Sequence, residues 1–154
     1  LAATGAYTEG WAEYAAQLAV GSGLYEPADL YGHYVMQLFF AVRLVVDTGL
    51  NDQGWSLQQA RAFMGEHTLE GAPLVESELL RYSTDIPGQA LSYAIGYQHF
   101  VDLRARTERS LGTLFDIRDF HEAMLEHGAV PLAVLDAQVD ELVLRGLSPN
   151  LRIE

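Results

Sequence analysis

The stretch from Pro27 to Gly49, PADLYGHYVMQLFFAVRLVVDTG, indicates the fold class of this chain. Its apolar side chains recur at steps of three and four residues, the period of an α-helix with one broad buried face. Pro27 suits the first turn of a helix and Gly49 suits its end. The stretch therefore predicts one long helix with an apolar face formed by Leu30, Tyr31, Tyr34, Val35, Leu38, Phe39, Val42, Val45 and Val46.

Helix-start signals recur along the rest of the chain. Ser56 and Gln59 have the spacing of a capping box, and Asp116 is a good N-cap. Prolines at the starts of further periodic runs suit first helical turns. These are Pro73, Pro87 and Pro131. No stretch shows the strict alternation of a half-buried strand. Residues 1–154 are therefore predicted to form a single all-α unit of about seven helices.

The charge of the chain excludes one large class of partners. The formal net charge is −12, and all nine basic residues are arginines. A nucleic-acid-binding surface needs a basic footprint to neutralise phosphates. We therefore expect no nucleic-acid partner, and we attribute the acidic surface mainly to solubility.

Hydropathy and cysteine content set two further limits. The longest apolar run, within Val35–Val46, is interrupted by Gln37 and Arg43 and is too short to span a bilayer. The chain contains no cysteine, which excludes disulfides and thiolate metal ligands. Because zero cysteines suit both compartments, a periplasmic or secreted location and a cytoplasmic location both remain open.

Several sequence blocks, taken in order, resemble a known bacterial family. The blocks are Thr8-Glu9-Gly10-Trp11-Ala12-Glu13-Tyr14, Arg43–Leu50, Gly54-Trp55-Ser56, Arg81-Tyr82, Pro87–Gly96 and Phe115–His121. From about Glu9 to Leu144 the chain is similar to the family called "domain of unknown function 885". Its members resemble, in fold, thermostable carboxypeptidases and thimet-type oligopeptidases. The resemblance implies a helical zincin-like metallopeptidase domain.

That resemblance gives Glu9 a specific role. The similar enzymes take two zinc ligands from an H-E-x-x-H helix, a motif absent from these 154 residues. By resemblance, the chain is the C-terminal part of a zinc peptidase, and Glu9 is the third metal ligand. Glu13, one turn further on, would orient a ligand histidine. From the residues alone, Glu9 could equally complement the dipole at a helix N-terminus, and Glu13 could simply be solvated.

Arg43 and Asp47 lie four residues apart in the long predicted helix. In Val-rich surroundings such charges must be paired or hydrogen-bonded. One interpretation is an internal Arg43–Asp47 ion pair that fixes helix packing. The other is a polar cleft wall in which Arg43 holds a substrate carboxylate and Asp47 supports a zinc ligand. The family often carries a histidine after this turn, where the chain has Asn51 and Asp52, so a catalytic role for the turn itself is in doubt.

The segment from Arg81 to Tyr93 is the predicted source of transition-state stabilisation. Peptide hydrolysis at zinc builds negative charge on the carbonyl oxygen, which a phenol or guanidinium can stabilise. In the similar carboxypeptidases, a tyrosine in a Tyr-x-x-Gly setting does this. By that match Tyr93 is the first candidate, Tyr82 and Arg81 are the second, and Gln89 is a candidate contact to the substrate backbone. The alternative is that Tyr93 belongs to a core stripe with polar tips.

The segment from His121 to His127 looks like a metalloprotease helix but lacks its geometry. H-E-x-x-H needs histidines four apart on one face, whereas these are six apart and point to different sides. We expect His121 to be a packing residue and His127 a charge at a helix C-terminus. The remaining histidines show no ligand spacing: His33, His67 and His99.

Two functions from different classes are consistent with these observations. The first is a zinc peptidase acting on peptides, with zinc in the full-length protein, none bound by this chain alone, and no activity of the isolated chain. The second is a non-enzymatic helical module that binds peptides or partner proteins. In a partial domain we also expect an exposed apolar face that supports self-association, formed by Trp11, Tyr14 and the Tyr31–Phe39 side of the long helix.

Overall fold

The computed structural model describes residues 2–148, with side chains from residue 4 onward. Within this range the chain forms seven α-helices and no strand, which confirms the predicted all-α fold. The helices are α1 (Ala2–Gly21), α2 (Pro27–Asn51), α3 (Leu57–His67), α4 (Ala72–Leu80), α5 (Leu91–Leu111), α6 (Ile117–Leu125) and α7 (Leu132–Leu147). A π-helical segment, Arg81–Asp85, follows α4, and a short 3-10 turn, Gly112–Leu114, follows α5.

The predicted helix starts are largely confirmed. Pro27 is the first residue of α2, Ser56 caps α3 with both capping-box hydrogen bonds to Gln59, and the Asp116 carboxylate accepts a hydrogen bond from the backbone N–H of Arg118. Pro87 is the exception, because α5 begins four residues later, at Leu91. The turn between Pro87 and Leu91 carries Gln89, a residue of the candidate site.

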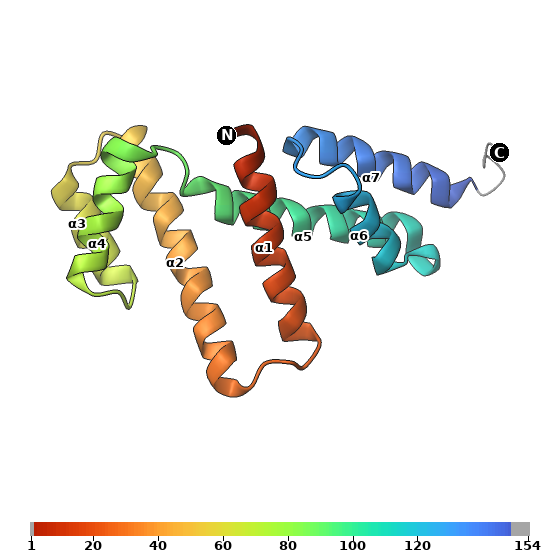
Figure 1. The fold of residues 1–154 in the computed structure, drawn as a ribbon, viewed down its shortest axis with the longest axis horizontal. Coiled ribbons are helices and arrows are strands. Elements are labelled where there is room, and N and C mark those ends of the chain that lie inside the picture. The colour runs from red at the N-terminus through yellow and green to blue at the C-terminus, as the bar shows by residue number, and fades with distance from the viewer. Residues whose placement is uncertain (1, 149–154) are drawn as a thin grey trace.

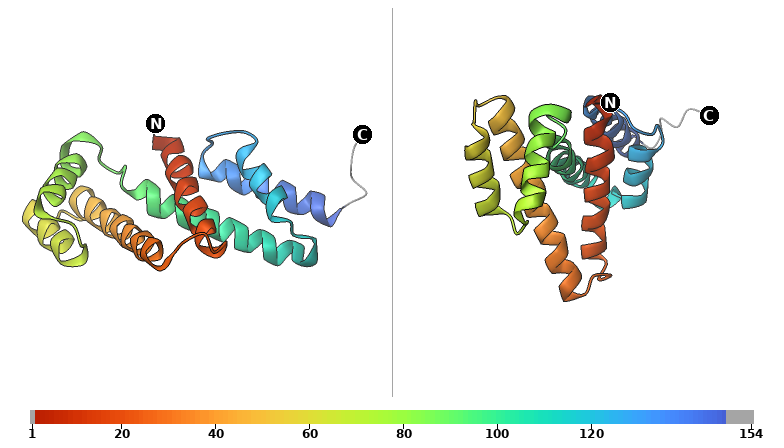
Figure 2. Two further views of the ribbon diagram at one scale, coloured as in Figure 1. Left: turned by 60° about the horizontal axis from the view of Figure 1, so that its bottom comes forward. Right: turned by 60° about the vertical axis from the view of Figure 1, so that its left-hand side comes forward.

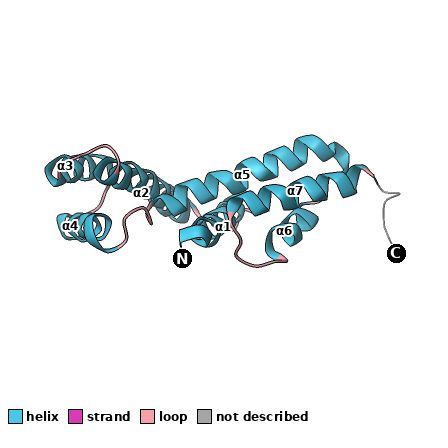
Figure 3. Ribbon diagram, turned by 90° about the horizontal axis from the view of Figure 1, so that it is seen from above, coloured by secondary structure: helices cyan, strands magenta, loops and turns pink. Residues whose placement is uncertain are grey.

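The helices form an elongated molecule with two apolar cores joined by α5. In Figure 1, α2, α3 and α4 lie at one end, α6 and α7 lie at the other, and α5 runs between them with α1 crossing it. Seen from above, α5 and α7 run side by side, with α6 beneath them (Figure 3). The first core is formed by α2, α3, α4 and the start of α5, around Val46, Met64 and Tyr82. The second is formed by α1, α5, α6 and α7, around Phe100, Phe120 and Leu135.

The crossing of α1 over α5 is a direct backbone contact. A Cβ atom added at Gly96 would lie 1.9 Å from the carbonyl oxygen of Ala6, and one added at Gly10 would lie 2.3 Å from the carbonyl carbon of Gly96. No side chain fits at either position, so only glycine permits this approach. The views in Figures 1 and 2 agree in placing the two helices against each other here.

Gly49 has a different role from the predicted one. It does not end α2, which continues to Asn51. Instead Gly49 is buried, and a Cβ atom there would lie 2.5 Å from the indole ring of Trp55. The glycine is therefore explained by close packing of Trp55 against the helix and not by helix termination.

The prediction of an exposed apolar face is partly correct for α2, where Phe39 is buried in the first core, and wrong for α1. Tyr31 is 65% exposed and Tyr34 is 58% exposed on α2. Tyr14 on α1 is instead buried, and Trp11 packs against the second core. None of the helices that the structure describes combines the length and apolarity that a bilayer crossing requires.

The helix crossing gives a direct test of the fold. Gly96→Ala forces a methyl group into the backbone of α1 and should lower the free energy of unfolding by about 3 kcal/mol in urea titrations. Gly65→Ala is the matched control, because this helical glycine in α3 has open space around it. There the better helix propensity of alanine should raise stability by about 0.5–1 kcal/mol. Equal effects at the two positions would contradict the backbone contact.

Candidate functional site

A buried arginine on α2 forms the centre of the candidate site. Arg43 is 4% exposed, and its Nε donates to the hydroxyl of Tyr82 at 2.9 Å and lies 3.1 Å from the carboxylate of Glu78. Aromatic rings surround the guanidinium, the nearest being that of Tyr93, at 4.6 Å from the ring centroid. The other rings are those of Phe39, Phe40 and Tyr82. A buried cation of this kind needs a full set of partners, and here it has them.

The anion that neutralises Arg43 is Glu78, not Asp47. Glu78 is 4% exposed on α4 and also contacts Arg81 and the hydroxyl of Tyr82. The predicted Arg43–Asp47 ion pair is therefore wrong. Sequence reasoning missed Glu78, although it is the one acidic residue on α4 that stands three and four positions before Arg81 and Tyr82, the spacing of contacts along a helix.

Asp47 instead organises the turn before α5. Its buried carboxylate accepts hydrogen bonds from the backbone N–H groups of Gly88, at 2.9 and 3.0 Å, and Ala90, at 3.2 Å. It also accepts from the Asn51 side chain at 2.7 Å. Gly88 has a φ of +82°, a conformation that glycine adopts readily. Asp47 thus fixes the backbone on both sides of Gln89.

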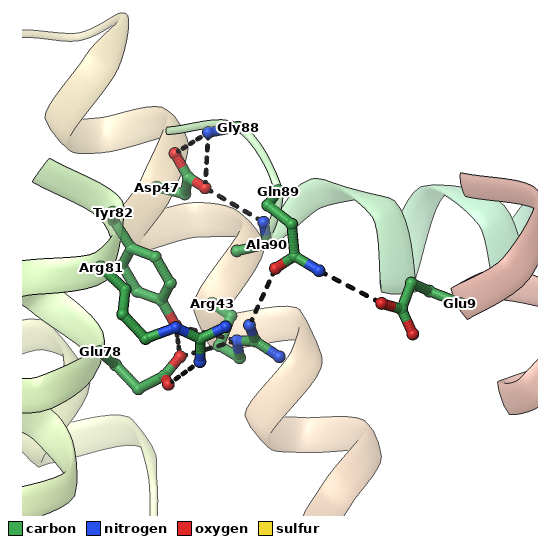
Figure 4. Close-up of polar contacts among 9 residues, drawn as sticks. All are labelled: Glu9, Arg43, Asp47, Glu78, Arg81, Tyr82, Gly88, Gln89 and Ala90. Atoms are coloured by element: carbon green, nitrogen blue, oxygen red, sulfur yellow. Dashed lines mark hydrogen bonds and ion pairs between the residues drawn. The ribbon is translucent and has the colours of Figure 1, made fainter. Parts of the chain in front are cut away.

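Gln89 connects the buried arginine to Glu9 (Figure 4). Its side-chain oxygen accepts from Arg43 at 3.4 Å, and its side-chain nitrogen donates to Glu9 Oε1 at 3.2 Å. Because a guanidinium can only donate, the amide oxygen must face Arg43 and the NH₂ group must face Glu9. Arg43 therefore sets the orientation of the amide, and the amide presents a donor to Glu9.

Glu9 lies inside α1 and not at its start. The helix begins at Ala2, so Glu9 is about two turns from the N-terminus, and the alternative of a dipole-complementing first-turn residue is wrong. Its side chain is half-buried. Among hydrogen bonds between described residues, the one that reaches Glu9 is at Oε1. The carboxylate is thus held at one oxygen while the residue remains accessible.

Glu13 continues this polar row along α1. Its carboxylate accepts from the side-chain amide of Gln37 on α2 at 2.9 Å. Burial raises the pKa of Glu13, and the charge of Glu9 raises it further. One turn beyond, Gln17 contacts His33 of α2 at 2.9 Å. Side chains rather than close backbone packing therefore join α1 and α2 along this edge.

The three candidates for oxyanion stabilisation lie in different environments. Tyr82 is fully buried, and burial followed by its hydrogen bond to Glu78 raises its pKa. Its hydroxyl donates to Glu78 and accepts from Arg43, so it is directed inward. Arg81 is partly exposed but engaged with Glu78. Tyr93 is half-buried and stacks on Phe40 with ring centroids 4.5 Å apart, so both interpretations of this residue, core member and functional hydroxyl, remain open.

Arg43 is enclosed by aromatic rings and engaged by Glu78, Tyr82 and Gln89. The guanidinium therefore positions the Gln89 amide, and the direct contact of Arg43 to a substrate stays a prediction. Arg81 and Tyr82 lie in a π-helical segment, a rare feature that is frequent at functional sites.

The described residues do not supply a complete metal site. Across residues 4–148 no group of three His, Asp or Glu side chains converges as metal ligands would. His121 is half-buried and contacts the hydroxyl of Tyr14 at 3.0 Å, in the predicted packing role, while His127 is exposed beyond the end of α6. A catalytic zinc needs three protein ligands, so the described residues do not complete such a site around Glu9.

Comparison with protein families shows that this chain belongs to the bacterial proteins of unknown function called DUF885, whose family model matches residues 1–139. This confirms the family indicated by the sequence blocks. No curated protein matches the chain.

A solved structure supports the same relationship. The chain is similar to the crystal structure of "the putative lipoprotein from Colwellia psychrerythraea", with 43% identity and a TM-score of 0.88. The match covers 92% of this chain and 24% of the other, so the chain spans about a quarter of the length of that protein.

The buried network predicts a specific stability cost. Tyr82→Phe removes the hydroxyl that contacts both Arg43 and Glu78, and should lower the free energy of unfolding by about 2 kcal/mol, because a buried charged pair then loses a hydrogen-bond partner. Tyr31→Phe is the control, since Tyr31 is 65% exposed on α2, and should change stability by less than about 0.5 kcal/mol. A Tyr82→Phe protein as stable as the control variant would contradict the network.

The raised pKa of Glu13 predicts that replacing this carboxylate with a neutral side chain raises the free energy of unfolding in a pH-dependent way. The folded state holds the Glu13 proton more tightly than the unfolded state, so ionising the group at neutral pH opposes folding. Glu13→Gln should therefore raise the free energy of unfolding at pH 7. The gain should disappear below the unfolded pKa of about 4.3, where wild-type Glu13 is protonated in both states. Urea titrations at pH 7 and pH 3.5 measure this, and a gain that is independent of pH would contradict the assignment.

Proposed function

We propose that this chain is the C-terminal part of a zinc-dependent peptidase in which Glu9 is a metal ligand and the other ligands come from elsewhere in a longer polypeptide. One observation carries the proposal: the Glu9 carboxylate is held by the side chain of Gln89 at an accessible edge of a buried polar network. The isolated chain, with one ligand, would then be inactive.

The arrangement behind Glu9 suits a metal-binding carboxylate. Metal ligands are commonly oriented by a further layer of hydrogen-bonding groups. Here Glu78 neutralises Arg43, Arg43 orients the Gln89 amide, and that amide donates to Glu9. Asp47 holds the backbone of the turn that carries Gln89. The network thereby limits the rotamers of Glu9, which favours metal binding.

Tyr93 is the proposed donor to the developing oxyanion. Zinc, when bound, would supply a Lewis acid and an activated water. Tyr93 would supply a hydrogen bond to the carbonyl oxygen as negative charge accumulates. It stands four residues after Gln89 on the first turn of α5, and its ring stacks on Phe40 and lies close to the Arg43 guanidinium. Tyr82 and Arg81 would stabilise the network through their contacts with Glu78.

The likeness to a protein described as a lipoprotein supports placing this peptidase outside the cytoplasm.

The competing function is a non-enzymatic helical module that binds peptides. Metal dependence and turnover distinguish the two functions.

The test uses the full-length protein and two conservative substitutions. Glu9→Gln keeps the size of the side chain but removes the ligand charge, and should weaken zinc binding at least about 10-fold with loss of peptide hydrolysis. Tyr93→Phe removes one hydroxyl, and should lower kcat about 100-fold while zinc content stays unchanged. Zinc is measured by atomic emission after competition with a chelator.

The control variant is Glu122→Gln, which changes an exposed carboxylate on α6, a helix that packs on the second core. It should keep both zinc and turnover. Normal zinc binding in Glu9→Gln would place the metal elsewhere, and a wild-type protein without zinc-dependent hydrolysis would favour the binding module.

A further inference from the structure

A hollow of about 660 Å³ lies between α1 and α2, next to the candidate site. It extends from Glu13, one turn beyond Glu9 on α1, to Tyr25 in the loop that connects the two helices. Its volume is within the range of ligand pockets in proteins, about 300–1,000 Å³. The hollow is therefore large enough to hold part of a substrate.

The walls of the hollow are partly apolar. Tyr25, Met36 and Phe40 line it, and Gly32 opens it further because no atom lies within 4 Å of the place where a Cβ would stand. Phe40 also stacks on Tyr93. Phe40 therefore lines the hollow and also supports Tyr93, the proposed oxyanion donor.

The charges that line the hollow are carboxylates. Glu13 and Asp29 contribute to the lining, and no arginine does; His33 also lines the hollow and contacts Gln17. Glu13 accepts from the neutral amide of Gln37, and Asp29 accepts from the backbone N–H of Glu26. In the part of the chain that the structure describes, neither carboxylate makes an ion pair. Glu13 is half-buried and contacts a neutral donor, which makes it complementary to a cation, whereas Asp29 is exposed and caps its own helix.

We propose that this hollow binds a lysine or arginine side chain of the peptide substrate, with the cation at Glu13. The aliphatic stem would lie on Met36 and Phe40, as long basic side chains do on apolar surface. The inference rests on the proposed peptidase function in taking a peptide as the ligand. It adds a preference for basic residues close to the scissile bond.

The test measures binding without hydrolysis. Full-length protein is titrated, in the presence of a metal chelator, with two N-acetylated fluorescent peptides that differ only by arginine or its neutral isostere citrulline. The arginine peptide should bind at least about 10-fold more tightly, a difference of about 1.4 kcal/mol. The preference should weaken as salt is raised, because charge pairs are screened.

Two variants separate the effect of the Glu13 charge on peptide binding from the effect of the shape of the hollow. Glu13→Gln should reduce the arginine preference to less than about twofold and leave the affinity for the citrulline peptide unchanged, which also shows that the variant is folded. Gly32→Leu fills the hollow, and should weaken both peptides about 10-fold or more. Glu122→Gln, on α6, should keep the wild-type preference.

Equal binding of the two peptides by wild type would overturn the inference, as would an arginine preference that survives Glu13→Gln. A full-length protein that binds neither peptide would mean that another segment fills the hollow, and would also overturn it. Failure of the proposed function gives a different result: the arginine preference persists, but no zinc-dependent hydrolysis occurs.

Discussion

The backbone contact between Gly10 and Gly96 is the constraint on which the rest of the structure depends. It brings α1 against the second turn of α5, the helix that both apolar cores share. Glu9 precedes one of these glycines directly, and Tyr93 lies one turn before the other. Any side chain at the crossing would separate the helices and move Glu9 away from Gln89. The crossing therefore determines the fold and the geometry of the candidate site together.

The buried network around Arg43 is costly as a source of stability alone. Desolvating Arg43, Glu78 and Asp47 opposes folding, and well-packed apolar residues often stabilise a core at least as well as buried ion pairs. What these groups provide is a fixed orientation of the Gln89 side chain. A guanidinium fixes the orientation of an amide, and a carboxylate fixes the backbone of the turn that carries it. Apolar residues could not direct Gln89 toward Glu9 in this way.

Local signals in the sequence predicted most of the helices. The caps at Ser56 and Asp116 and the apolar period of α2 act over a few residues, so the sequence shows them directly. Contacts between distant segments were not predictable in the same way. Arg43 could have paired with Asp47 or with any other carboxylate, and only the packing of α4 against α2 brings Glu78 to it.

The family resemblance identified Glu9, Gln89 and Tyr93 without indicating how they are related. Periodicity could not show that Gln89 bridges to Glu9, because the two residues are eighty positions apart. Gly49 shows the same limit: a glycine near the end of a helical run predicts termination, whereas here a tryptophan ring packs on it. The sequence reports local preference, and the site is built from contacts that local preference does not encode.

The distribution of charge connects these features. Among the described residues, the carboxylates that form ion pairs with arginines lie in or next to α4, α5, α6 and α7: Glu76, Glu78, Glu108, Asp116, Asp136, Asp140 and Glu141. The α1 carboxylates, Glu9 and Glu13, contact only the neutral amides of Gln89 and Gln37. Two carboxylates one helical turn apart repel each other, and burial adds to the cost at Glu13. A chain with formal net charge −12 could relieve that repulsion by pairing either residue with an arginine. Keeping both paired to amides at an accessible edge is what a site for an external cation requires, whether that cation is a metal at Glu9 or a basic side chain at Glu13.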